Sequence, residues 1–219
     1  MNGWNVKSAI LDFVYPASCP FCGKEAARPD YCCKECADKL APPAELIDLP
    51  PLNGFLSVTA YNDYSKKIIH AAKEENDGCA ITAMAVLMYK RILSQGLADK
   101  IDGITYVPMH RADKRRRGYN QSRLLAQELE RLTGKPCVNL LEKTRRTAEQ
   151  KSLNAQQRRE NLAGAFKFAR KHKAEGASVL LIDDVCTTGS TLRECGAQLV
   201  AAGMKNVFAL VFAKTENFS

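Results

Sequence analysis

Several features that define large protein classes are absent from this sequence. Its 219 residues include one tryptophan and three histidines, and no stretch approaches the ~18 apolar residues of a membrane-spanning helix. Neither Gly-x-x-x-x-Gly-Lys-Ser/Thr nor Gly-x-Gly-x-x-Gly occurs, so two common phosphate-binding loops are missing. The N-terminal segment also lacks the basic start and continuous apolar core of a secretion signal. We therefore expect a cytoplasmic protein that does not insert into a membrane.

Positive charge is concentrated in the middle of the chain. The net charge is +8, and residues 111–173 carry 18 Lys or Arg against 6 Asp or Glu. This basic segment indicates an anionic partner, either a polyphosphate ligand or a nucleic acid, although a solvated basic face would give the same pattern. Hydrophobic residues make up 46% and charged residues 26% of the chain, which is ordinary for a globular protein.

Five of the nine cysteines lie close together near the N-terminus. Two Cys-x-x-Cys pairs have the spacing of a closed four-thiolate zinc site, with no open position for catalysis. Disulfides are disfavoured in a reducing compartment, and an alternative pairing through Cys32 has a less suitable spacing. We predict a zinc ribbon over residues 1–40 that holds a structural Zn²⁺. Its ligands are Cys19, Cys22, Cys33 and Cys36.

The rest of the chain has the pattern of an α/β domain. A proline-rich stretch predicts a linker over 41–54, and a single domain follows over 55–219. Short apolar runs there alternate with amphipathic ones, which predicts a parallel sheet flanked by helices. Ligands bind such sheets at the carboxyl ends of the strands. The expected strands are 55–61, 104–108, 138–141, 179–182 and 207–213, and the expected helices are 64–73, 81–93, 122–132 and 192–202.

The polar turn after the apolar run 179–182 is the most informative motif. Asp183 and Asp184 end this strand, and a turn rich in hydroxyl groups leads into a helix. Backbone N–H groups at a helix N-terminus favour phosphate, whereas two carboxylates suit sugar hydroxyls with a metal ion nearby. An ordinary helix cap would need only one such polar residue. The turn consists of Thr187, Thr188, Gly189, Ser190 and Thr191.

This stretch resembles the phosphoribosyl pyrophosphate (PRPP) motif of type I phosphoribosyltransferases. The whole chain is similar to the ComF family, which joins a double-cysteine zinc ribbon to the type I phosphoribosyltransferase fold. Three further segments carry the resemblance. They are Val107-Pro108 with Arg117-Gly118-Tyr119-Asn120-Gln121, the stretch from Arg146-Thr147 to Gln150, and the stretch from Arg158 to Phe166.

The resemblance implies a role for each part of the site. Asp183 and Asp184 would act in catalysis by binding the ribose hydroxyls of PRPP, with Mg²⁺ bridging ribose and pyrophosphate, and the turn 187–191 would bind the 5-phosphate. A basic loop would bind pyrophosphate through Arg111, Lys114, Arg115, Arg116 and Arg117. A flap over 143–159, for which a solvated loop is the alternative, would contribute Arg145, Arg146 and Gln150.

Two functions are compatible with this resemblance. The first is a PRPP-binding, Mg²⁺-dependent protein that transfers or senses phosphoribosyl groups (pentosyl transfer) and is linked to DNA uptake and natural transformation. The alternative is a catalytically silent protein that binds single-stranded DNA, with Tyr119 as a candidate for stacking on bases, and works with other DNA-uptake proteins. No pocket for a nucleobase can be identified from the residues, which leaves both the acceptor and the activity open.

Overall fold

The computed structural model describes residues 19, 21–24, 33–40, 46–74, 78–147, 162, 164–169 and 175–215. Within these ranges the main sheet has the strand order β1-β2-β7-β6-β3, and a second, antiparallel sheet pairs β4 with β5. The main strands are β1 (Ile47–Leu49), β2 (Leu52–Ala60), β3 (Gly103–Tyr106), β6 (Ser178–Cys186) and β7 (Asn206–Lys214). The small sheet consists of β4 (Leu141–Lys143) and β5 (Phe166–Phe168).

The centre of the main sheet is parallel. β2, β7, β6 and β3 run in one direction, and only the short edge strand β1 is antiparallel to its neighbour. β6 and β7 lie in the middle and are apolar on both faces, as expected for strands covered on both sides. Their carboxyl ends therefore meet at one edge of the sheet, where the polar residues that follow β6 are placed.

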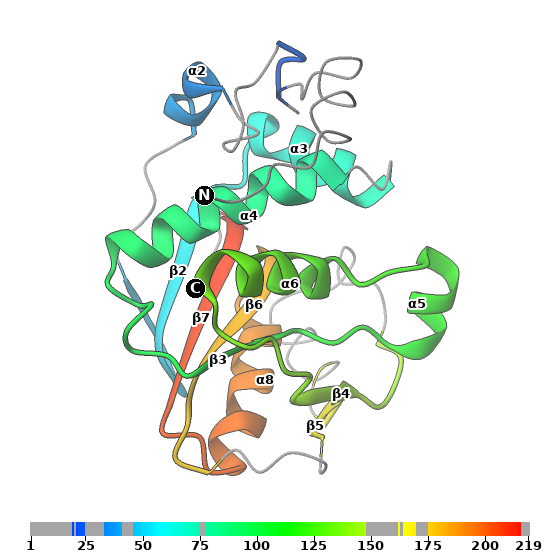
Figure 1. The fold of residues 1–219 in the computed structure, drawn as a ribbon. Helices are drawn as coiled ribbons and strands as arrows, with labels where there is room; N and C mark the ends of the chain where they lie inside the picture. Colours follow the sequence, from blue (N-terminus) through cyan, green and yellow to red (C-terminus); the bar gives the residue numbers. More distant parts are fainter. Residues whose placement is uncertain are drawn as a thin grey trace, which may run out of the picture.

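Helices form a layer on each face of the sheet (Figure 1). On one face, Met84 of α4 and Leu125 of α6 are fully buried against the strands, and the apolar residues of α3 join the same core. On the other face, Leu192 of α8 packs with Phe166 of the small sheet. The helices are α3 (Asp63–Glu74), α4 (Gly78–Ser94), α6 (Gln121–Thr133) and α8 (Ser190–Ala201). None of the described helices has the length and apolarity needed to cross a membrane.

The region expected to be a basic loop is instead a helix, α5 (Arg111–Arg117). The imidazole Nδ1 of His110 accepts a hydrogen bond from the backbone N–H of Ala112 at its start, and Gly118 ends it with φ 89°. Arg and Lys are good helix formers, but α5 buries no residue and so has no apolar period that could predict it.

Two other expectations differ from the structure. β1 and the start of β2 lie inside the predicted linker 41–54, because Pro50 and Pro51 sit in the turn between two antiparallel strands rather than within one. The strand expected at 138–141 lies further along as β4, while Cys137 makes only an isolated bridge to Ile104. Both segments are at sheet margins, where few neighbours specify the register.

The cysteine-rich segment packs directly on α3. The rings of Phe21 and Tyr64 are stacked with their centroids 5.0 Å apart and their planes 7° from parallel. Cys19 and Cys36 are buried in the same apolar core as the inner face of α3. The described part of the ribbon also contains the short helix α2 (Lys34–Asp38), which lies above α3 in Figure 1.

Candidate functional site

The acidic pair was expected to end its strand but lies inside β6, which continues to Cys186. Three separate elements position this pair. Asp183 Oδ1 accepts hydrogen bonds from Ser122 Oγ at 2.7 Å and from the Asp184 backbone N–H at 2.9 Å. The Asp184 carboxylate forms an ion pair with the ammonium group of Lys73, near the end of α3. Asp184 Oδ1 also accepts a hydrogen bond from the Val185 N–H at 2.9 Å. β6, α6 and α3 thus converge on two neighbouring carboxylates.

The two carboxylates have different affinities for protons. Burial, and then repulsion by Asp184, raises the pKa of Asp183 to about 7. Burial also disfavours the charge on Asp184, but the Lys73 ammonium outweighs it and lowers the pKa of Asp184. Burial likewise opposes the charge on Lys73, yet the two carboxylates keep its pKa raised. At neutral pH the pair therefore carries a negative charge at Asp184, while Asp183 titrates near pH 7.

The hydroxyl-rich stretch 187–191 follows β6, and its last two residues, Ser190 and Thr191, begin α8 earlier than expected. Thr188 Oγ1 and Ser190 Oγ are 2.9 Å apart, and Gly189 adopts φ 74°, a left-handed conformation that favours glycine. Arg193 Nη1 donates to the Thr188 carbonyl at 2.9 Å, and Thr215 Oγ1 donates to the Thr187 carbonyl at 3.0 Å. The turn surrounds a small hollow of about 30 Å³ at the N-terminus of α8 that also includes Asp183. Its hydroxyl and N–H groups suit a phosphate.

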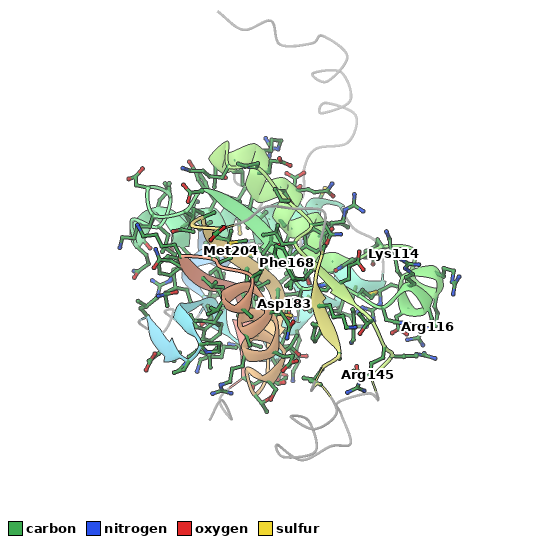
Figure 2. The ribbon with its side chains drawn as sticks, turned by 90° about the horizontal axis from the view of Figure 1, so that it is seen from below. Lys114, Arg116, Arg145, Phe168, Asp183 and Met204 are labelled. Atoms are coloured by element: carbon green, nitrogen blue, oxygen red, sulfur yellow. The ribbon has the colours of Figure 1, made fainter. Side chains whose placement is uncertain are left out.

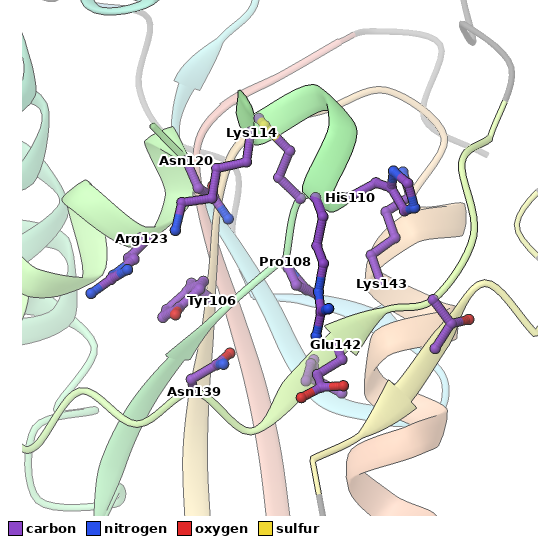
Figure 3. A pocket seen from close by; sticks show the side chains of 13 residues that line it. Tyr106, Pro108, His110, Lys114, Asn120, Arg123, Asn139, Glu142 and Lys143 are labelled. Carbon is purple, nitrogen blue, oxygen red and sulfur yellow. The ribbon is translucent and has the colours of Figure 1, made fainter. Parts of the chain in front are cut away.

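The five cations predicted to bind pyrophosphate all lie on α5, but they do not face the same space. Arg111 and Lys114 line a cavity of about 470 Å³ beside β3, which is shown in Figure 3. The remaining three cations are exposed on the helix and do not line this cavity. These are Arg115, Arg116 and Arg117.

An ion pair connects the beginning of the predicted flap to α5. Arg146 Nε and Nη2 each lie 3.1 Å from Asp113 Oδ1, and Arg145 is exposed. Lys143 Nζ donates to Thr147 Oγ1 at 2.9 Å. Gln150 lies outside the described residues.

The four predicted zinc ligands come together in space. The Sγ atoms of Cys19, Cys22, Cys33 and Cys36 all lie within 4.8 Å of one another, and those of Cys22 and Cys33 are 3.7 Å apart. A tetrahedral site with Zn–S bonds of about 2.3 Å requires sulfur atoms roughly 3.8 Å apart. The donor set and its spacing therefore fit a closed structural Zn²⁺ site, with Cys33 as one ligand.

Two residues of the site were not recognised in the sequence. Lys73 occupies the basic last turn of an amphipathic helix, where a lysine is ordinary, and Ser122 begins another helix. Only their contacts with the acidic pair in the structure identify them as residues of the site. Tyr119 has a structural role, because its hydroxyl lies 2.7 Å from the Lys73 carbonyl oxygen and 3.0 Å from that of Ala72. It links the loop before α6 to the end of α3 that carries Lys73.

Curated relatives match nearly the whole chain. "DNA utilization protein YhgH" of Salmonella typhimurium is 32% identical over 90% of this chain and 84% of its own length. "Competence protein F" of Haemophilus influenzae is 29% identical over 87% and 82%, respectively. "Competence protein ComFC" of Bacillus subtilis is 28% identical over 84% and 72%. Each alignment therefore covers more than four fifths of this chain.

Family models match both parts of this architecture. Residues 10–47 match the double zinc ribbon domain, and residues 66–217 match the phosphoribosyl transferase domain. The structure of adenine phosphoribosyltransferase from Saccharomyces cerevisiae is 14% identical over 83% of this chain and 88% of that chain, with a TM-score of 0.43. The matched segments and the full-length relatives show that the chain belongs to the ComF family, in which a zinc ribbon precedes a type I phosphoribosyltransferase fold.

Proposed function

We propose that this protein binds PRPP in the presence of Mg²⁺ and transfers or senses its phosphoribosyl group. One observation carries the proposal: Asp183 lines the hollow formed by the hydroxyl-rich turn at the N-terminus of α8, and Asp184 follows it in β6. A ribose 5-phosphate has the same order of groups, with vicinal hydroxyls next to a phosphate. The turn would hold the 5-phosphate and the carboxylates would accept hydrogen bonds from the ribose hydroxyls.

The residues present also fit Mg²⁺, which prefers carboxylate and phosphate oxygens. Asp183 and Asp184 would hold the ion together with PRPP oxygens, and when bound it would neutralise charge that develops on the leaving pyrophosphate. The side chains themselves orient the ribose, and Lys73 keeps Asp184 ionised so that it can accept hydrogen bonds. The acceptor that would form the new bond at the ribose carbon is not specified by these residues.

Calorimetric titration with PRPP tests this function. We expect saturable binding in the presence of Mg²⁺ and at least tenfold weaker binding when the metal is chelated, because the carboxylates would then face the anionic ligand directly. Ribose 5-phosphate is the matched control, since it keeps the turn contacts and lacks pyrophosphate. No binding of PRPP at millimolar concentration with Mg²⁺ present would contradict the proposal.

A second candidate function is binding of single-stranded DNA in the cytoplasm, alongside other DNA-uptake proteins. Lys114, Arg116 and Arg145 lie on the same side of the molecule, which Figure 2 shows, and Asp183 is nearer the centre. Arg115 and Arg117 add exposed charge on α5. The names of the relatives refer to DNA utilization and competence, and they favour DNA binding as a second function of the same protein.

This second function predicts a strong dependence on salt. Replacing Arg115 and Arg116 by alanine is expected to reduce the slope of log K against log salt by roughly 1.4 for single strands. The control replaces Lys100 and Lys205, which precede β3 and β7 at the opposite end of the sheet. Fluorescence anisotropy at several salt concentrations measures both variants. Equal losses in the two variants would contradict a specific role for α5.

A further inference from the structure

Helix α3 contacts the zinc ribbon at one end and the acidic pair at the other. Tyr64 lies in its first turn and Lys73 in its last turn. Nine residues separate the two, which corresponds to about 14 Å of helix at about 1.5 Å per residue. Tyr64 is stacked on Phe21 of the ribbon, and Lys73 forms an ion pair with Asp184. One helix therefore joins the metal site to the candidate ligand site.

The first turn of α3 contributes to the surroundings of the zinc ligands. Burial raises the pKa of the Cys36 thiol, and a hydrogen bond from the Tyr64 side chain opposes this increase. Tyr64 thus donates to a zinc-binding thiolate from outside the ribbon, while its ring packs on Phe21. Hydrogen bonds of this kind orient metal ligands, and their loss typically weakens metal binding or activity by about 10–100-fold.

The body of α3 shares its apolar core with the ribbon. Ile68 and Ala72 are fully buried in this core, and Cys19 and Phe21 of the ribbon belong to the same cluster. If the ribbon left this core, part of the apolar surface around α3 would face water. Such a loss of packing lowers the free energy needed to open a helix locally. Removal of zinc is therefore expected to loosen α3 along its length.

The last turn of α3 is attached to the acidic pair more loosely than its middle is attached to the core. The Lys73 side chain is 27% exposed, whereas that of its partner Asp184 is 13% exposed. A loosened α3 would allow the Lys73 ammonium to move into solvent, while Asp184 would stay in the sheet. The position of the Asp184 carboxylate would then no longer be fixed by an ion pair, and a buried charge without its partner is unfavourable.

We propose that α3 couples zinc binding in the ribbon to ligand binding at the acidic pair, with Tyr64 and Lys73 as the positioning residues. The proposal rests on the proposed function, because its ligand is PRPP with Mg²⁺. Zinc fixes the ribbon against α3, α3 keeps Lys73 at Asp184, and the ion pair keeps Asp184 in place for the ribose. Coupling between two binding sites is reciprocal, so bound PRPP should strengthen zinc binding by the same factor.

Zinc affinity tests the first half of this connection without PRPP. Competition with a chelating dye measures it in the full-length protein. Tyr64→Phe keeps the ring that stacks on Phe21 and removes only the hydroxyl, so we expect zinc to bind about tenfold more weakly. Tyr89→Phe is the matched control, because it removes a tyrosine hydroxyl from α4 in the same core. An equal zinc affinity in Tyr64→Phe and the control would overturn the role of Tyr64.

Amide hydrogen exchange tests whether zinc acts along α3, again without PRPP. Zinc-free protein is prepared by chelation and dialysis and compared with zinc-loaded protein by mass spectrometry. We expect peptides covering residues 66–73 to exchange at least about fivefold faster without zinc, and peptides of β7 to be unchanged, since β7 lies in the middle of the sheet. Equal exchange of residues 66–73 in both forms would overturn the proposal.

Calorimetric titration with PRPP and Mg²⁺ tests the second half. Removing zinc should weaken PRPP binding at least about fivefold in the wild type, within the usual range of coupling between sites. Lys73→Met should reduce this effect of zinc to less than twofold, whereas Lys73→Arg, which keeps the cation, should retain it. An equal effect of zinc in the wild type and Lys73→Met would contradict a connection through Lys73. If PRPP binds to none of these proteins, the proposed function fails, and hydrogen exchange alone decides whether zinc acts on α3.

Discussion

The Asp183→Asn protein is expected to lose roughly 100-fold in affinity for PRPP with Mg²⁺ and yet to unfold at a higher temperature than the wild type at pH 8. A hydrogen bond to a charged group contributes about 1.5–3 kcal/mol, which corresponds to this loss of affinity. The higher unfolding temperature has a different cause. Asparagine removes a buried negative charge, and its amide oxygen can still accept the hydrogen bond from Ser122 Oγ. Calorimetry and thermal denaturation measure the two effects.

The pH dependence of the stability change distinguishes the loss of this charge from a nonspecific effect of the substitution on the fold. The folded protein holds the proton of Asp183 up to a pKa of about 7, above the ordinary value of 3.8. Folding therefore favours the protonated form, so this residue's contribution to stability falls as pH rises from about 4 to 7 and is lowest above 7. The gain from Asp183→Asn should thus be several degrees at pH 8, at about 2–4 °C for each kcal/mol, and disappear near pH 4.

Ligand affinity should change with pH in the opposite direction. The ionised form of Asp183 accepts hydrogen bonds from ribose hydroxyls and binds Mg²⁺, so wild-type affinity should rise as pH increases through 7. Asp99→Asn is the matched control, because Asp99 is exposed and distant in sequence from the site. A stability gain that is the same at pH 4 and pH 8 would contradict the assignment of the raised pKa.

Loss of zinc should have the largest effect on the N-terminal part of the chain. Cys33→Ser is expected to abolish zinc binding, because three thiolates leave the tetrahedral site open. Structural zinc sites contribute about 10–16 kcal/mol in isolated zinc-binding peptides, so the ribbon should unfold with the metal. Phe21 would then leave Tyr64, and the cooperative unfolding temperature should fall.

Cys32→Ser is the informative control for this experiment. It removes a neighbouring thiol from the same segment, and we expect it to retain one zinc ion per chain. Metal analysis by mass spectrometry and protease sensitivity of the ribbon measure the outcome. Zinc retained by Cys33→Ser and lost by Cys32→Ser would reverse the assignment of the ligand.

Some elements of this protein could be predicted because their cause is local in sequence. The part of β6 before Asp183 is a continuous apolar run, and the turn after the strand combines hydroxyl groups with Gly189, so the type of site follows from neighbouring residues alone. The two Cys-x-x-Cys pairs are equally local, and the structure brings their sulfur atoms together. Helix α5 was missed for the converse reason, since it has no buried face to give an apolar period.

The parallel sheet, the pattern of zinc-binding cysteines and the position of the acidic pair along the chain could be predicted because each depends on residues that are neighbours in the chain, and the family followed from the resemblance of whole motifs. The three-dimensional structure was needed to show that Lys73 pairs with Asp184 and that Ser122 donates to Asp183. It also divided the basic residues of α5 between a cavity and an exposed surface. These contacts join residues far apart in the chain, and the physical state of a charge depends on which groups surround it in space.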